Sequence, residues 1–394
     1  MAEPFRVLVL NQISEKGLRR LPTDRYVTGK DLADPDAVLV RSADLHAMEI
    51  PATVRAIGRA GAGTNNIPLP AMSARGIPVF NTPGANANAV KELVLAGMLM
   101  AARNLAPALR FVAQLDAAAP DLEQQVEAGK KDFAGTELAG QTLGVIGLGK
   151  IGCLVADAAI RLGMDVMGFD PEITVDAAWS LPAQVRRAAS VDEVLRQSHF
   201  ISLHVPLVAA TRDLVNAQNL AAVQPGAVLL NFSREGVVND PAVLAALDSQ
   251  QLRWYVCDFP GHSTLGHPGV IALPHLGAST REAEENCAVM VAGQLRDFLE
   301  NGNIVNAVNF PAVSMARESR FRVAIANANV PNMLGQISTA MAHAGLNIHN
   351  MVNKSSGDMA YTLVDIDSPA QEAVLDALRA IEGVLAVRYL PQGQ

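Results

Sequence analysis

Cysteine, charge and long apolar runs are all scarce in this sequence of 394 residues, and each scarcity excludes a class of protein. The three cysteines, Cys153, Cys257 and Cys287, are widely spaced and lie in apolar segments. An odd number at this spacing argues against a disulfide framework and against a metal-binding cluster. We therefore expect reduced thiols in the core and no metal site.

Charged residues make up only 18% of the chain, whereas 50% of the residues are hydrophobic. This balance is typical of a well-packed globular protein. The net charge is −8 without a basic run, so neither nucleic acid nor a membrane surface is an expected partner. No apolar run has the length of a membrane span, and the first residues lead into a strand pattern without a targeting segment. We expect a cytoplasmic protein.

The length predicts two or three domains, and the order of strand and helix patterns predicts an α/β fold in three parts. Residues 1–86 read as a small flavodoxin-like α/β substrate-binding domain, to which residues 282–310 return. Residues 87–281 repeat strand and helix, as expected for a Rossmann domain with a doubly wound parallel sheet. Residues 318–394 have the order βαββαβ, which is ferredoxin-like.

Apolar and β-branched runs predict the individual strands. In the first part they are 6–10, 37–40, 54–58 and 78–80. In the second part they are 142–148, 164–169, 199–205, 227–232, 253–258 and 270–273. In the third part they are 321–326, 348–353, 359–366 and 384–390.

The run Val145–Gly152 (VIGLGKIG) is a glycine turn between a predicted strand and a predicted helix. Such glycines permit a tight turn, close approach of a pyrophosphate and close helix packing, and the helix N-terminus binds the phosphates. Asp170 ends the next strand, where an acid bonds a ribose 2′-hydroxyl and repels a 2′-phosphate, which favours NAD over NADP. The alternative is a plain turn followed by a helix-starting acid. The residues predicted to bind NAD here are Gly147, Gly149, Lys150, Ile151, Gly152 and Asp170.

Two arginines, Arg41 and Arg59, follow predicted strands of the first part. Carboxyl ends of parallel strands are where such sheets bind ligands. After Arg59 comes a glycine-rich loop with Gly61, Gly63 and Asn65, whose N–H groups suit an anion. Each arginine alone is equally well explained as a solvated surface charge. The pair together with the loop favours an anionic substrate.

Polar groups also follow three strands of the second part, at Arg234, Asp258 and His275. Hydride transfer to a keto acid needs a cation for the carboxylate and a group that exchanges a proton with the oxygen on the reacting carbon. Arginine is a permanent bidentate donor, and histidine titrates near neutral pH. Taken singly, a histidine after a proline is often only a packed or capping residue.

These motifs together resemble the D-2-hydroxyacid dehydrogenase family over essentially the whole chain, and within it the phosphoglycerate dehydrogenases with a C-terminal ACT domain. Beside VIGLGKIG, the matching runs are RAGAG at 59–63, SLHVP at 202–206, NFSR at 231–234, DFP at 258–260 and PHLGAST at 274–280.

The resemblance implies an NAD-dependent oxidation of 3-phospho-D-glycerate to 3-phosphohydroxypyruvate, the first step of L-serine biosynthesis. It implies that Arg234 clamps the substrate carboxylate and that His275 is the general acid/base. It further implies that Asp258, His204 and Pro206 join the cofactor site. Arg41 and Arg59 take the places of substrate phosphate contacts, in agreement with the anion site.

One position departs from the family. The family pairs its histidine with a glutamate a few residues after the Asp-Phe-Pro run, where this chain has His262. Two alternatives therefore stay open: a dehydrogenase for another D-2-hydroxy acid, and a weakly active sensor that binds NAD and an amino acid.

In the C-terminal part, the resemblance places Asn327, Asn329 and Asn347 at an effector site between two copies, with L-serine as the expected ligand. The alternative is a purely structural dimerisation sheet, since asparagines also favour turns. A homodimer or homotetramer is expected in either case.

Overall fold

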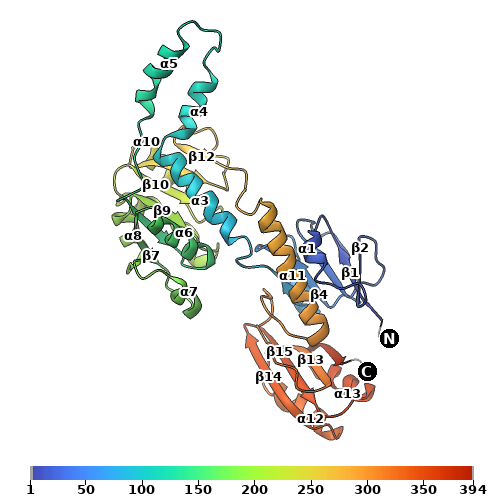
Figure 1. Cartoon of the computed structure of the whole chain (residues 1–394). Coiled ribbons are helices and arrows are strands. Elements are labelled where there is room, and N and C mark those ends of the chain that lie inside the picture. Colours follow the sequence, from blue (N-terminus) through green and yellow to red (C-terminus); the bar gives the residue numbers. More distant parts are fainter. Residues whose placement is uncertain (1–2, 393–394) are drawn as a thin grey trace. The chain divides into compact units, whose positions relative to one another are not determined.

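The computed structural model of the protein describes residues 3–392 (Figure 1). They form two compact units. The flanking unit is built from the chain up to Asn86 and the chain from Arg281 onward, and the central unit is Ala87–Thr280. Both contain parallel sheets with helices, and a small antiparallel sheet lies in the C-terminal part, so the predicted fold class is confirmed.

The first sheet of the flanking unit has five parallel strands in the order β2-β1-β3-β4-β5, the flavodoxin-like order. The strands are β1 (Phe5–Val9), β2 (Tyr26–Gly29), β3 (Ala37–Val40), β4 (Ala56–Arg59) and β5 (Val79–Phe80), with the short helices α1 (Glu15–Leu18) and α2 (Leu69–Ala74). The sequence pattern misses β2. That edge strand has one buried residue among its four and therefore no apolar run.

Helix α11 (Arg281–Asn301) covers one face of this sheet. Its buried side is apolar and includes Val291 and Leu295, both fully buried. Gly58 of β4 makes the close approach possible, because a Cβ there would lie 2.6 Å from a methyl of Val291. The segment after residue 281 thus returns to the first sheet.

The sheet of the central unit has seven parallel strands in the order β12-β11-β10-β9-β6-β7-β8. The strands are β6 (Thr142–Ile146), β7 (Asp165–Phe169), β8 (Arg186–Arg187), β9 (Phe200–Leu203), β10 (Ala227–Asn231), β11 (Leu252–Cys257) and β12 (Val270–Ala272). Six of them are predicted. The missed strand, β8, consists of two exposed arginines at the sheet edge.

Helices flank this sheet in the doubly wound arrangement. They are α3 (Ala87–Ala102), α6 (Lys150–Arg161), α7 (Val175–Ser180), α8 (Val191–Gln197), α9 (Ala217–Leu220) and α10 (Asp240–Asp248), with the single turn η2 (Ala209–Thr211).

An arm leaves the central unit after α3. It contains α4 (Leu105–Ala113), α5 (Leu122–Gly129) and η1 (Lys130–Phe133), and Figure 1 shows α4 and α5 running side by side away from the sheet. Within residues 3–392 no single helix is long and apolar enough to cross a membrane. Only α3 and α4 taken together have the length and composition of a membrane span, and they are bent by 69° relative to each other.

The C-terminal part follows the predicted order βαββαβ. Its strands form an antiparallel sheet in the order β14-β15-β13-β16. The elements are β13 (Phe321–Ala328), α12 (Met333–His343), β14 (Ile348–Ser356), β15 (Met359–Ile366), α13 (Glu372–Arg379) and β16 (Val384–Pro391).

Within the flanking unit the C-terminal sheet shares a core with the first sheet. One apolar cluster contains Val7 and Leu39 from the first sheet, Phe298 from α11, and Ala324 and Leu363 from the C-terminal sheet. The division into three parts that the sequence suggests does not anticipate this shared core.

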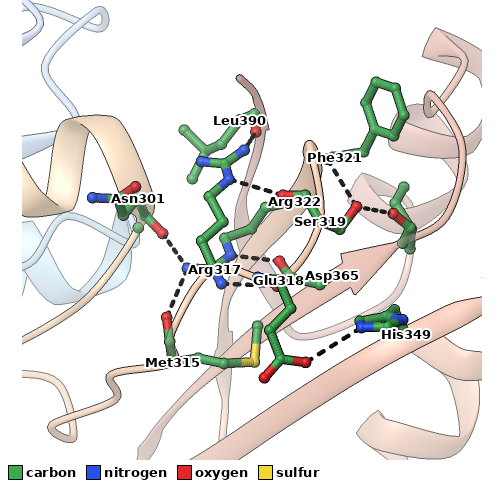
Figure 2. A network of polar contacts seen from close by, with 12 residues as sticks. Asn301, Met315, Arg317, Glu318, Ser319, Phe321, Arg322, His349, Asp365 and Leu390 are labelled. Atoms are coloured by element: carbon green, nitrogen blue, oxygen red, sulfur yellow. Dashed lines mark hydrogen bonds and ion pairs between the residues drawn. The ribbon is translucent and has the colours of Figure 1, made fainter. Parts of the chain in front are cut away.

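A buried ion pair of the C-terminal sheet lies next to the end of α11. Arg322 and Asp365 have fully buried side chains joined by two hydrogen bonds of 2.6 and 3.0 Å. Arg322 also donates to the carbonyls of Asn301 and Met315 at 3.0 Å, as Figure 2 shows. Burial raises the pKa of Asp365, but the hydrogen bonds from Arg322 and the N–H of Glu318 outweigh it and hold the pKa below its usual value.

Candidate active site

The glycine turn lies between β6 and α6 and has the geometry of a phosphate-binding turn. Gly147 has a φ of +90°, and a Cβ on Gly152 would lie 2.0 Å from the carbonyl oxygen of Gly147. A Cβ on Gly149 would meet no atom within 4 Å. The space beside Gly149 is therefore open, in front of the first N–H groups of α6 at Lys150 and Ile151.

Asp170, at the end of β7, lies beside this turn. Its carboxylate accepts hydrogen bonds of 2.9 Å from the N–H groups of Leu148 and Glu172. The negative charge is thus held next to the open space at Gly149. A dinucleotide with a free ribose hydroxyl fits this arrangement, whereas a 2′-phosphate meets a carboxylate.

His204 follows β9 and borders the same turn. Its backbone N–H donates to Ile146, and its carbonyl oxygen lies 2.5 Å from the place a Cβ on Gly147 would take. Its Nε2 lies 2.9 Å from the hydroxyl of Ser202. Burial lowers the pKa of His204 to about 4. The imidazole is therefore neutral near pH 7. The carbonyl of Pro206 accepts from Thr211.

Arg234 and His275 contact the same aromatic ring. The guanidinium carbon of Arg234 lies 5.8 Å from the centre of the Phe259 ring, and the ring centres of Phe259 and His275 are 4.5 Å apart. Both polar side chains are exposed. Asn231 fixes the loop of Arg234 by donating to its carbonyl at 3.0 Å. The structure thus brings the two predicted catalytic residues to one place in the central unit.

Asp258 directly precedes Phe259 in the chain and is buried, with only 1% of its surface exposed. Its two carboxylate oxygens accept hydrogen bonds from the N–H groups of Leu276 at 2.7 Å and Gly277 at 2.8 Å. Its place in the cofactor site, which the family resemblance implies, stays a prediction. Among the described residues, the carboxylate binds the backbone of the loop that carries His275.

His262, where the family has its glutamate, is exposed. Among residues 3–392 no carboxylate forms an ion pair with His275. The carboxylate of Asp240 lies beside the loop of His262 and accepts from the hydroxyl of Ser263 at 3.2 Å. Burial and the nearby Glu235 raise the pKa of Asp240.

In the flanking unit, Arg41 directly follows β3, and Arg59 is the last residue of β4. Arg41 forms an ion pair with Glu284 at 2.7 Å. The Arg59 guanidinium lies over Gly61, since a Cβ there would be 1.6 Å from its Nη1.

The loop that carries Gly61, Gly63 and Asn65 is tied to the segment that follows β3. Asn66 donates to the carbonyl of Ala43 at 2.7 Å, and the carbonyl of Asn65 bonds His46 at 3.2 Å. The sequence pattern does not single out Asn66 or Glu284. Only the fold brings them to Arg41.

Similarity to known proteins agrees with these sites. Residues 95–277 match the family model of the D-isomer-specific 2-hydroxyacid dehydrogenase NAD-binding domain. A D-3-phosphoglycerate dehydrogenase of Escherichia coli K12 is 34% identical over 351 residues, which are 85% of this chain and 81% of that protein. This chain belongs to the D-2-hydroxyacid dehydrogenases. They are NAD-dependent oxidoreductases, and the residues around Gly149 fit NAD.

Other relatives support the membership. A D-3-phosphoglycerate dehydrogenase of Synechocystis is 36% identical over 71% of this chain, which spans half the length of that protein. Among solved structures, a protein of Thermus thermophilus has a TM-score of 0.62 at 27% identity and covers 77% of this chain and 100% of its own. An NAD+-bound 3-phosphoglycerate dehydrogenase of Entamoeba histolytica shares the fold, with a TM-score of 0.60 at 24% identity over 77% of this chain and 98% of its own.

The three asparagines at the expected effector site do not meet in one chain of this dehydrogenase. Asn327 and Asn329 lie at the end of β13 that pairs with Ala360 and Met359 of β15. Asn347 precedes β14, whose first residue pairs with the other end of β15. A site that uses all three asparagines therefore needs a second copy. No group of three or more His, Cys, Asp or Glu suited to a metal occurs within residues 3–392.

Proposed function

We propose that this dehydrogenase oxidises 3-phospho-D-glycerate to 3-phosphohydroxypyruvate with NAD, the reaction that opens L-serine biosynthesis. The observation that supports it most is the arrangement of Arg234 and His275 on one ring. Relatives at 34% and 36% identity carry the name of this activity.

In this reaction NAD supplies the hydride acceptor. His275 takes the proton of the substrate 2-hydroxyl while the hydride leaves C2, so the alcohol loses two electrons and two hydrogens in all. Arg234 binds the carboxylate and the oxygen on C2 with its planar pair of donors. Both side chains are exposed, as contact with substrate requires.

The phosphate of the substrate binds Arg41, Arg59 and the glycine-rich loop in this proposal. Arg41 is already paired with Glu284 at 2.7 Å. The phosphate therefore competes with a carboxylate, which weakens its net attraction. This pair is also the observation that favours the second candidate, a dehydrogenase for a D-2-hydroxy acid without a phosphate.

Production of NADH from 3-phospho-D-glycerate, measured beside D-lactate, D-glycerate and D-2-hydroxyglutarate, tests the proposal. We expect His275→Gln to lower kcat by about 10²- to 10⁴-fold, because general base catalysis is lost. His343→Gln, the same change at an exposed histidine of α12, is the matched control and should keep kcat. A preference for a substrate without phosphate would overturn the proposal in favour of the second candidate. NAD binding with no turnover would favour the sensor.

We further propose L-serine as an effector at the paired C-terminal sheets, resting on Asn327 and Asn329. The side-chain oxygen of Asn327 is buried without a hydrogen-bond partner among the described residues. Titration calorimetry with L-serine and with L-alanine measures this. Absence of heat and of inhibition by serine would leave the sheet as a structural element.

The arm supports the proposed homodimer or homotetramer. Leu105, Leu109 and Val112 lie along one side of α4 and are 41%, 67% and 56% exposed. Apolar rows of this kind mark contacts between chains. Sedimentation of the whole protein gives the subunit number.

We also propose a location in the cytoplasm. The three free cysteines agree with it, because thiols stay reduced in that compartment.

A further inference from the structure

His275 has a backbone conformation that its residue type disfavours. Its φ is +56°, in the left-handed region that side chains other than glycine rarely adopt. Such a conformation persists only where surrounding contacts hold it, and positions of this kind are frequent at active sites.

Asp258, which follows β11, makes three hydrogen bonds to this segment. Its carbonyl accepts from the N–H of His275 at 3.1 Å, and its carboxylate accepts from Leu276 and Gly277. A Cβ on Gly277 would lie 3.1 Å from the carboxylate, so a larger residue there would push against Asp258. Three successive N–H groups thus depend on one buried residue.

Phe259 restricts the imidazole. Its ring lies 4.5 Å from the ring of His275, with 50° between the planes, and is half-buried. The same ring lies under the guanidinium of Arg234 at 5.8 Å. One side chain therefore sets the spacing of the two groups that meet the substrate.

We propose that Asp258 and Phe259 are positioning residues for His275, with Asp258 setting its backbone and Phe259 the direction of its ring. The inference rests on the proposed function, in which His275 takes the substrate proton. It explains how this chain orients its histidine although His262 occupies the glutamate position. Orientation then comes from the residues that follow β11.

Asp258→Asn tests the backbone part. The amide keeps the shape of the side chain but turns a donor toward one of two N–H groups. A small displacement of a reacting group costs about 10²-fold in rate, so we expect kcat to fall by that order. The dissociation constant of NAD, measured by fluorescence titration, separates this loss from a loss of cofactor binding, because kcat is measured at saturating NAD. A variant that keeps its kcat at saturating NAD would overturn the proposal.

Asp240→Asn is the matched control. Asp240 is a partly buried aspartate of the same unit that bonds Ser263 and not the segment of His275, so kcat should be unchanged.

Phe259→Leu tests the role of the ring and should lower kcat and shift the pH profile of kcat. Phe259→Tyr, which keeps an aromatic ring, should have the kcat and the pH profile of the natural protein. Equal activity of the Leu and Tyr variants would remove Phe259 from the proposal.

The backbone of His275 provides a readout that does not need activity. A crystal structure of Asp258→Asn should show His275 outside the left-handed region. Retention of a φ near the original value would contradict the role of Asp258. If the natural protein does not oxidise 3-phospho-D-glycerate, the proposed function is wrong. The positioning role of Asp258 is still tested in that case, because it depends on the φ of His275 in the variant and not on activity.

Discussion

His204 lies beside the glycine turn as a neutral imidazole. One ring nitrogen lies 2.9 Å from the hydroxyl of Ser202, and the other is buried without a hydrogen-bond partner among the described residues. Protonation would place a charge in a buried site, and among the described residues no carboxylate forms an ion pair with His204. Burial therefore lowers the pKa from 6.5 to about 4.

The stability of the protein should consequently fall in mild acid. Between these two pKa values the unfolded chain binds a proton at His204 that the folded chain does not, so acid favours unfolding. The free energy of unfolding should drop by up to about 1.4 kcal/mol per pH unit between roughly pH 6.5 and 4. Urea unfolding at several pH values measures this slope. His204→Asn, which cannot titrate, should show a smaller slope; an equal slope would show that His204 is not the cause.

At the scale of elements, two glycines of the turn between β6 and α6 have different roles: Gly149 leaves space for a ligand, and Gly152 allows the helix to pack closely. Gly149 has a φ of −77°, which any residue adopts, and open space at its Cβ position. Gly152 has no space, because a Cβ would lie 2.0 Å from the Gly147 carbonyl. One glycine serves the ligand and the other serves the packing of α6 on β6.

Two alanine substitutions should therefore behave differently. Gly149→Ala should leave the melting temperature unchanged and weaken NAD binding, since the methyl group takes space needed by the pyrophosphate. Gly152→Ala should destabilise the protein by about 1–3 kcal/mol, the range for overpacking, and weaken NAD binding as well. Calorimetry and NAD titration of both variants measure the contrast. A loss of stability in Gly149→Ala would contradict it.

The strands with the most deeply buried apolar runs are all among those that the sequence predicts. All five residues of β10 and all four of β3 are buried, and both strands are found where the pattern places them. The missed strands, β2 and β8, lie at sheet edges with mostly exposed residues. Their pairing depends on a neighbouring strand and not on a pattern of their own.

At the scale of the whole molecule, the shared core of the flanking unit joins its two sheets. The ion pair between Arg322 and Asp365 lies within the C-terminal part and also binds the end of α11 through Asn301 (Figure 2). Arg388 of β16 adds to this by donating to the carbonyls of Phe298 and Leu299. The two sheets should therefore lose their structure together.

Asp365→Asn tests this coupling. It leaves the buried charge of Arg322 without its partner, which costs about 3–5 kcal/mol in comparable cases. Hydrogen exchange should become faster in β1 and β3 as well as in β13. Asp376→Asn, which breaks an exposed pair with Arg379, should change stability by less than about 1 kcal/mol. Faster exchange confined to the C-terminal sheet would show that the sheets unfold separately.

The sequence by itself determined the α/β class, the glycine turn, the residues that follow the strands and the membership in the dehydrogenase family. The first three rest on local patterns: apolar periodicity, glycine spacing, and polar residues where strands end. The membership rests on the resemblance of several motifs to a known family. Only the tertiary structure decided that Phe259 lies between Arg234 and His275, that Glu284 pairs with Arg41, and that the C-terminal sheet shares a core with the first. Those contacts join residues far apart in the chain, and no local pattern records which distant side chain will fill a given space.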